Sequence, residues 1–91
     1  MWILYIIKCR DSQLYTGITE NLERRLKEHK RKGSHFTSYN PATNLLYTEE
    51  YINLLQAEER EAQIKHWSRA KKLALINGDK DELRNLSKSH D

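Results

Sequence analysis

Five side chains in the first two thirds of the chain could together act on a phosphate: Tyr5, Tyr15, Arg25, His29 and Glu61. A phenol can relay or accept a proton from water, and a guanidinium can stabilise charge on a phosphoryl group. A carboxylate can hold a divalent ion that stabilises a leaving oxygen. If these groups meet in space, they suit phosphodiester hydrolysis. Taken singly, each has a structural alternative, such as a strand tyrosine whose hydroxyl reaches the surface.

The spacing of the residues around Arg25 predicts where the first helix presents its cations. Each helical residue turns by about 100°. One stripe of the helix therefore holds Leu22, Arg25, Leu26 and His29. Because the leucines must face the sheet, Arg25 and His29 are expected at the edge of the buried stripe. Their alternative role is to snorkel at this boundary. The cations expected to point elsewhere are Arg24, Lys27 and Arg31.

Glu61 occupies an unusual place in the second helical segment. It lies four residues after Ala57 and three before Ile64, in the middle of the apolar face. A carboxylate turned toward a core is costly unless a cation or a metal ion meets it. The sequence leaves two partners open. One is Lys65, four residues further on; the other is a Mg²⁺-type ion completed by water and phosphate.

Strand patterns predict a small sheet. Residues 2–9 are apolar on both faces, which predicts a central strand covered by helices above and below. Second and third strands are expected at Leu14–Ile18 and Leu45–Ile52, with a loop over residues 34–44. The predicted fold is an α/β (α+β) sandwich with a three-stranded antiparallel sheet, and 91 residues indicate one domain over 1–91.

Helical patterns fill the remaining segments. One helix should open at Thr19 or Glu20 and run to about Arg31, and a second pattern begins at Asn53. This second pattern continues to Leu75, with a break favoured near Ser68. A short last helix is expected at Lys80–Ser87, capped by Asp79. The predicted order of elements is β-β-α-β-α-α.

The hairpin between the first two strands decides where the tyrosines lie. A three-residue loop at Asp11–Gln13 would pair Cys9 with Tyr15 and place Tyr5 and Tyr15 on one face. A two-residue loop would place them on opposite faces, because side chains alternate along a strand. The residues alone do not choose between the two loops.

The distribution of charge indicates which class of partner the protein could bind. The net charge is only +3, but the cations gather in two clusters that suggest a polyanion-facing side. The first contains Arg24, Arg25, Lys27, Lys30, Arg31 and Lys32; the second contains Lys65, Arg69, Lys71 and Lys72. The alternative is a pair of solvated helix faces.

The number of cysteines and the N-terminal segment indicate in which cellular compartment the protein is expected. A single cysteine, Cys9, excludes an internal disulfide and a multi-cysteine zinc site. The N-terminal apolar run is too short to span a membrane and lacks signal-peptide features. A soluble cytoplasmic protein without a membrane partner is therefore expected.

The motifs, read in order, resemble the GIY-YIG nuclease superfamily, and in particular its stand-alone single-domain bacterial members. The stretches that carry this resemblance are Tyr5, YTGIT from Tyr15, LERRLKEH from Leu22, AxxxExxIK from Ala57 and WSRAKK from Trp67. Ile3-Leu4-Tyr5 stands in place of the first triplet, and Tyr15-Thr16-Gly17 in place of the second.

The resemblance implies roles for individual residues. Tyr5 and Tyr15 match the two family tyrosines, and Gly17 matches the second glycine, where the backbone approaches closely. Arg25 matches the catalytic arginine, and His29 a position filled by histidine or tyrosine in relatives. Glu61 matches the glutamate that binds a single Mg²⁺ or Mn²⁺ ion. The family's three-stranded fold also places both tyrosines on one side, which favours the three-residue loop.

The implied function is a metal-dependent endonuclease acting on DNA, in a superfamily with members in DNA repair. Tyr5 is the favoured general base, with His29 taking its proton, and Arg25 steadies the phosphoryl oxygens. Relatives take target recognition from other domains, so a protein partner could supply specificity here. The alternative is a non-catalytic nucleic-acid-binding or adaptor module on the same fold.

Overall fold

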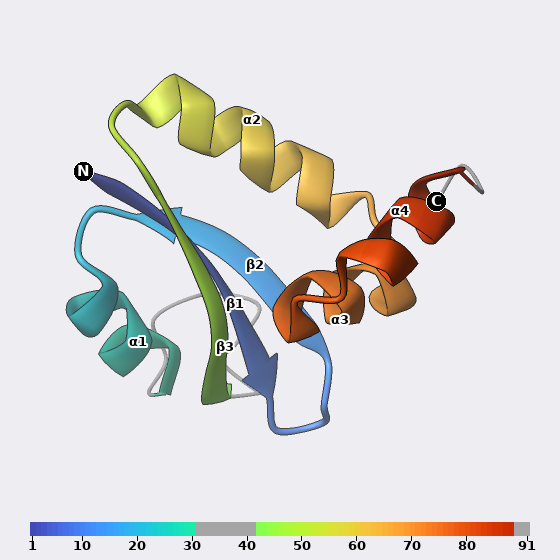
Figure 1. The fold of residues 1–91 in the computed structure, drawn as a ribbon. Coiled ribbons are helices and arrows are strands. Elements are labelled where there is room, and N and C mark those ends of the chain that lie inside the picture. The colour runs from blue at the N-terminus through green and yellow to red at the C-terminus, as the bar shows by residue number, and fades with distance from the viewer. Residues whose placement is uncertain (31–41, 89–91) are drawn as a thin grey trace.

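The computed structural model describes residues 1–30 and 42–88, and of Lys30, Ala42 and Thr43 the backbone only. Its strands and helices follow one another in the order β-β-α-β-α-α-α (Figure 1). They are β1 Trp2–Cys9, β2 Leu14–Thr19, α1 Leu22–Lys30, β3 Ala42–Tyr51, α2 Leu54–Lys65, α3 Arg69–Asn77 and α4 Lys80–Lys88. The predicted α+β class is confirmed, and the break near Ser68 accounts for the added helix.

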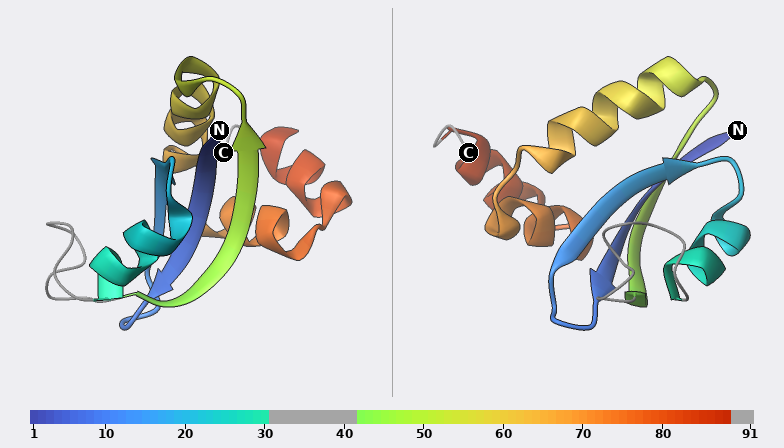
Figure 2. Two further views of the ribbon diagram at one scale, coloured as in Figure 1. Left: turned by 90° about the vertical axis from the view of Figure 1, so that its left-hand side faces the viewer. Right: turned by 180° about the vertical axis from the view of Figure 1, so that it is seen from behind.

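The three strands form one antiparallel sheet in the order β2-β1-β3, so β1 is the central strand, as predicted. Its side chains alternate between two apolar clusters. Tyr5 and Ile7 pack against α1, while Leu4 and Ile6 pack against Ile64 of α2 and residues of α3. Helices consequently cover both faces of the sheet, with α1 on one side and α3 and α4 on the other (Figure 2, left).

The hairpin that joins β1 and β2 places both tyrosines on the same face. Gly17 lies opposite Tyr5, and Tyr15 lies opposite Ile7. The loop has three residues, as the resemblance favoured, but it spans residues 10–12 instead of 11–13. The backbone N–H of Cys9 therefore bonds to Gln13, at 2.9 Å, and the predicted Cys9–Tyr15 pair is wrong. The cause is Ser12, whose φ of 73° supplies the left-handed residue that a three-residue hairpin needs.

Two element boundaries also differ from the prediction. Helix α1 begins at Leu22 because the Asn21 side chain accepts a hydrogen bond from the backbone N–H of Arg24, at 3.0 Å, and so caps the helix. Strand β3 begins at Ala42, so residues 42–44 of the predicted loop are strand. The remainder of that loop lies outside the described residues.

Side-chain caps separate the C-terminal helices. Asn53 caps α2 and Ser68 caps α3, each accepting from the backbone N–H three residues on. The left-handed Gly78 ends α3, and Asp79 caps α4 through the N–H of Glu82, at 3.1 Å. These caps explain why the long helical pattern after Asn53 folds as separate helices. Within the described residues, none of the helices has the length and apolarity to cross a lipid bilayer.

Replacing Thr16 or Thr19 of β2 with valine should change the free energy of unfolding in opposite directions. Thr16 is 3% exposed, and its Oγ1 has no hydrogen-bond partner among the described residues. Replacing an unsatisfied hydroxyl with a methyl group, Thr16→Val, should raise the free energy of unfolding by about 1 kcal/mol. Thr19 Oγ1 instead accepts from the Asn21 N–H at 3.1 Å and donates to its carbonyl at 3.3 Å. Thr19→Val should therefore lower it by about 1 kcal/mol.

Urea unfolding of both variants provides the measurement. If both variants raised or both lowered the free energy of unfolding, the hydrogen bonding described for the two hydroxyls would be contradicted.

Candidate active site

Three aromatic side chains meet on the α1 face of the sheet. The Tyr5 hydroxyl and Nε2 of His29 are 2.7 Å apart, in a buried hydrogen bond. The Tyr15 ring lies 4.9 Å from the His29 ring and 6.3 Å from the Tyr5 ring, between centroids. His29 is fully buried and Tyr5 is 1% exposed, whereas Tyr15 is only partly buried. Of the two phenols, Tyr15 therefore has the readier access to solvent.

Burial keeps the Tyr5–His29 pair neutral. It raises the pKa of Tyr5 to about 12, although a hydrogen bond from Arg25 opposes the rise. It lowers the pKa of His29 to about 4, helped by the positive charge of Arg25 and opposed by Glu28. At neutral pH the phenol therefore keeps its proton and the imidazole has none to spare. When His29 carries its proton on Nδ1, the Tyr5 hydroxyl donates to Nε2, so the pair is a short path for a proton.

Arg25 connects this pair to the rim of the site. Its guanidinium donates to Glu28 across 2.7 Å and also hydrogen-bonds to the Tyr5 hydroxyl. Burial lowers the pKa of a guanidinium, but these two acceptors raise that of Arg25 above its usual value. The Arg25 side chain is 27% exposed, so the cation remains accessible from one side. Arg25 can therefore face both the phenol and an incoming anion.

Gly17 leaves space for the Tyr5 hydroxyl. A Cβ atom added at Gly17 would lie 2.5 Å from the Tyr5 hydroxyl oxygen and 2.7 Å from its ring carbon Cζ. Both distances are shorter than van der Waals contact, so any other residue would displace the phenol. Gly17 is itself buried, so the Tyr5 hydroxyl fills the space that a side chain would take.

Glu61 lies on α2, which packs along β1 and β2 and, unlike α1, belongs to the other apolar cluster (Figure 2, right). Its side chain is 21% exposed and pairs with Lys65 at 3.3 Å, the first of the two partners that the sequence left open. Its negative charge is nevertheless one of the causes that raise the pKa of Tyr5. The charge of Glu61 therefore acts on Tyr5, although α2 and α1 pack in different apolar clusters.

The donor set suits one hard divalent ion and no preformed multi-ligand cage. Within residues 1–30 and 42–88, no three His, Cys, Asp or Glu side chains cluster as metal ligands. Mg²⁺ commonly uses one or two carboxylates and completes its shell with water and phosphate. The exposed Lys65 pair is worth roughly 0–1 kcal/mol, so an ion could replace it at Glu61.

The predicted basic clusters are only partly surface cations. On α1, Arg24 and Lys27 are exposed, whereas the side chain of Lys30 and all of Arg31 and Lys32 lie outside the described residues. In the second cluster, Lys65 and Arg69 are exposed, and Arg69 donates to the Ser12 carbonyl at 2.8 Å.

The two lysines of α3 differ from each other. Burial and the nearby Lys65 lower the pKa of Lys72, which keeps some exposure. Lys71 is 6% exposed, with its ammonium 4.3 Å from the centre of the Trp67 ring. Lys71 is therefore packed inside the molecule, which does not suit a contact with phosphate.

Sequence reasoning missed Glu28 as the partner of Arg25, although its i+3 spacing is a usable signal. It also missed a partly buried carboxylate on the other face, Glu49, which accepts hydrogen bonds from Tyr47, Tyr51 and Arg60. The alternation Tyr47, Glu49, Tyr51 on one strand face was the available signal.

Gly17→Ala should disrupt the phenol–imidazole pair. The added methyl group must push the Tyr5 hydroxyl away from His29 and should lower the free energy of unfolding by about 1–3 kcal/mol. Gly78→Ala is the control: it meets open space but has a φ of 69°, so it should cost about 1–2 kcal/mol through backbone strain alone. NMR signals of the His29 ring should shift in the first variant and stay unchanged in the second. Unchanged signals in Gly17→Ala would contradict the packing described.

Acidification should destabilise the protein through His29. Its pKa is about 4 in the folded state, against about 6.5 in an unfolded chain. The unfolded state therefore binds more protons between these values, and stability falls as pH decreases from 6.5 through 4. The full loss is about 3 kcal/mol.

His29→Gln should remove this loss, because glutamine does not titrate. Urea unfolding at a series of pH values gives the difference in the free energy of unfolding between the two proteins. The titrations of the carboxyl groups that both proteins share cancel in this difference. A parallel pH dependence in both would argue against a neutral, buried His29.

Comparisons with known proteins identify the family of the chain. Residues 1–74 match the GIY-YIG catalytic domain. A UPF0213 protein of Oceanobacillus iheyensis is 41% identical over 80 residues, covering 87% of this chain and 93% of that protein. A UPF0213 protein of Clostridium perfringens is 40% identical over 86 residues, covering 93% and 92% of the two chains.

One solved structure is also similar. The solution NMR structure of a UPF0213 protein from Bacillus halodurans aligns with a TM-score of 0.55 and 35% identity, covering 85% of this chain and 84% of that one. A matched catalytic domain over most of the chain, relatives of nearly equal length and a shared fold lead to one conclusion. The chain belongs to the GIY-YIG nuclease superfamily and is similar throughout to its UPF0213 proteins.

Proposed function

We propose that this protein is a metal-dependent endonuclease that hydrolyses phosphodiester bonds in DNA. The observation that carries the proposal is the buried 2.7 Å hydrogen bond between Tyr5 and His29, with Arg25 bonded to the same phenol. A packing role alone would not need a proton path and a cation at one hydroxyl. The family match over residues 1–74 supports the same reaction class.

In the proposed reaction, water attacks phosphorus while Tyr5 removes one of its protons. The high pKa of Tyr5 makes a free phenolate costly, so its own proton should move to Nε2 of His29 as the water proton arrives. A new O–P bond forms, and the bond from phosphorus to the 3′ oxygen breaks. Water loses one proton to Tyr5 while the Tyr5 proton passes to the imidazole, and the departing 3′ oxygen takes a proton from solvent. The nearby phosphate charge would stabilise this imidazolium. Tyr15, the more exposed phenol, is placed to orient the water or the phosphate.

Arg25 would bind the phosphoryl oxygens. It stays charged throughout, because its acceptors raise its pKa, and it can exchange its bond to the half-exposed Glu28 for one to phosphate. A guanidinium aimed at charge that develops in the transition state is a large catalytic contribution. Glu28 thus keeps the cation in place before substrate arrives.

Glu61 is the residue that would hold Mg²⁺ or Mn²⁺, by exchanging Lys65 for the ion. The ion, when bound, supplies Lewis-acid stabilisation of charge on the leaving oxygen. The released Lys65 would then be free to contact a neighbouring phosphate. Glu61 and Lys65 therefore act as a pair with two arrangements.

Exposed and partly exposed cations would guide the nucleic acid to the site. They are Arg24, Lys27, Lys65, Arg69 and Lys72. Lysine and arginine contacts to phosphate position a duplex without reading its sequence. We accordingly propose that target selection comes from a protein partner. Binding should weaken steeply as salt concentration rises, because phosphate contacts release counterions.

A nucleic-acid-binding or adaptor module without turnover is the second candidate. Two observations favour it: Tyr5 is only 1% exposed, and Lys65 already occupies Glu61. Either feature would have to change before water and an ion could reach the site. The same cations would serve this function.

A nicking assay with supercoiled, single-stranded and branched DNA separates the two candidates. With Mg²⁺ or Mn²⁺ we expect strand cleavage that EDTA abolishes. Arg25→Ala and Glu61→Gln should each lower the rate by about 100-fold or more, because each removes charge stabilisation in the transition state. Retardation of DNA without cleavage, at every metal and substrate, would support the binding module instead.

Matched controls come from exposed positions of the same charge. Arg84→Ala on α4 and Glu59→Gln, two residues before Glu61, remove similar charges outside the proposed site. Both should cleave at the unmodified rate. A loss of cleavage in these controls equal to that in Arg25→Ala and Glu61→Gln would contradict the site assignment.

A further inference from the structure

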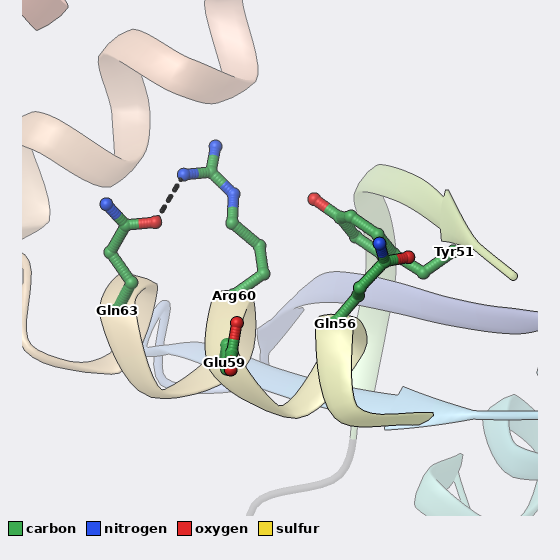
Figure 3. A pocket seen from close by; sticks show the side chains of 5 residues that line it. All are labelled: Tyr51, Gln56, Glu59, Arg60 and Gln63. Atoms are coloured by element: carbon green, nitrogen blue, oxygen red, sulfur yellow. Dashed lines mark hydrogen bonds between the residues drawn. The ribbon is translucent and has the colours of Figure 1, made fainter. Parts of the chain in front are cut away.

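A second polar network lies on the face of the sheet opposite the tyrosine pair. The Glu49 carboxylate accepts from the hydroxyls of Tyr47 and Tyr51, at 2.5 and 2.6 Å. It also accepts from Nε and Nη2 of Arg60, at 3.0 and 3.1 Å. The remaining guanidinium nitrogen, Nη1, donates to Gln63 at 2.8 Å (Figure 3). The Glu49 and Arg60 side chains are 16% and 23% exposed.

This network extends from β3 through α2 to α3. Arg60 lies 5.1 Å from the centre of the Trp67 ring, and Lys71 lies 4.3 Å from it. Arg60 and Gln63 also line an open pocket of about 520 Å³, together with Tyr51, Gln56 and Glu59 (Figure 3). All three guanidinium nitrogens thus donate to side chains of the protein.

Apolar packing alone holds α2 weakly. Across the whole of α2, only Ala57 and Ile64 are buried. Leu54 and Leu55 at its start are 40% and 65% exposed. Two small contact points leave a helix free to rotate about its axis. A two-pronged arginine–carboxylate pair is directional, so it can fix the rotation that packing does not.

Arg60 is the residue directly before Glu61, and successive helical residues differ by about 100° around the axis. Arg60 is bonded to Glu49 of β3, while Glu61, on another side of α2, pairs with Lys65. We propose that Arg60, anchored by Glu49, is a positioning residue for Glu61. The inference rests on the proposed function for its catalytic meaning, but the geometric claim stands separately.

The geometric claim can be tested without metal or substrate. A nitroxide attached at position 61, in a Cys9→Ala, Glu61→Cys background, should enhance the NMR relaxation of the Gly17 and Tyr15 amides. Arg60→Gln should reduce this enhancement at least twofold, and Arg60→Lys should restore part of it. Leu83→Ala on α4, a helix that packs against α3, should leave it unchanged. An unchanged enhancement in folded Arg60→Gln would overturn the proposal. If that variant does not fold, Glu49→Gln provides the same comparison.

The catalytic meaning is tested by Mn²⁺ binding, measured from the electron paramagnetic resonance signal of free Mn²⁺. Arg60→Gln should weaken binding about 10-fold, the usual effect of losing a group that orients a ligand. Leu83→Ala should bind like the unmodified protein, and Glu61→Gln should bind no ion. Binding unaffected by Arg60→Gln would overturn the role toward the ion. Ion binding that survives Glu61→Gln would instead refute the proposed metal site, and the relaxation result would still decide the positioning claim.

Discussion

The hydrogen bond between Tyr5 and His29 is the constraint on which the candidate site depends. It joins the central strand to α1 within the core, where neither group can turn to water instead. Burial keeps the phenol protonated and the imidazole neutral, so both partners are uncharged. One proton lies between the Tyr5 hydroxyl oxygen and Nε2 of His29. Arg25 hydrogen-bonds to the same oxygen and brings a positive charge to the pair, which Glu28 partly opposes. The same hydrogen bond thus holds β1 and α1 together and sets the protonation states of both partners.

The sheet edge explains how groups on opposite faces can act together. The tyrosine pair lies on the α1 face, and Glu61 extends from a helix on the other face. An interior strand would have kept them apart. β2 is an outer strand, and the Tyr5 hydroxyl occupies the space that a side chain at Gly17 would take. The charge of Glu61 nevertheless raises the pKa of Tyr5, so the groups on the two faces are electrostatically connected.

Much of the fold could be predicted because β1 is apolar on both faces, and only a central strand covered by helices satisfies that pattern. The stripe of Leu22, Arg25, Leu26 and His29 likewise predicted which helix face carries the cation and the imidazole. The extent of burial did not follow: His29 was expected at a boundary and is fully enclosed. The hairpin register depended on the backbone conformation of Ser12, which residue types alone do not reveal. Lys71 was assigned to a surface cluster because its charge could be read, whereas its packing over Trp67 is a tertiary contact.

The alternation of side chains along β1 limits which insertions and deletions the strand can tolerate. Odd-numbered side chains, Tyr5 and Ile7, face one helix, and even-numbered ones, Leu4 and Ile6, face the others. Inserting or deleting one residue inside this strand would reverse that parity and send the phenol into the apolar layer under α2. The turn at residues 10–12 is constrained in the same way, because a change of one residue there would shift the register of β2 and move Tyr15 to the other face. The central strand can vary in composition but hardly in length.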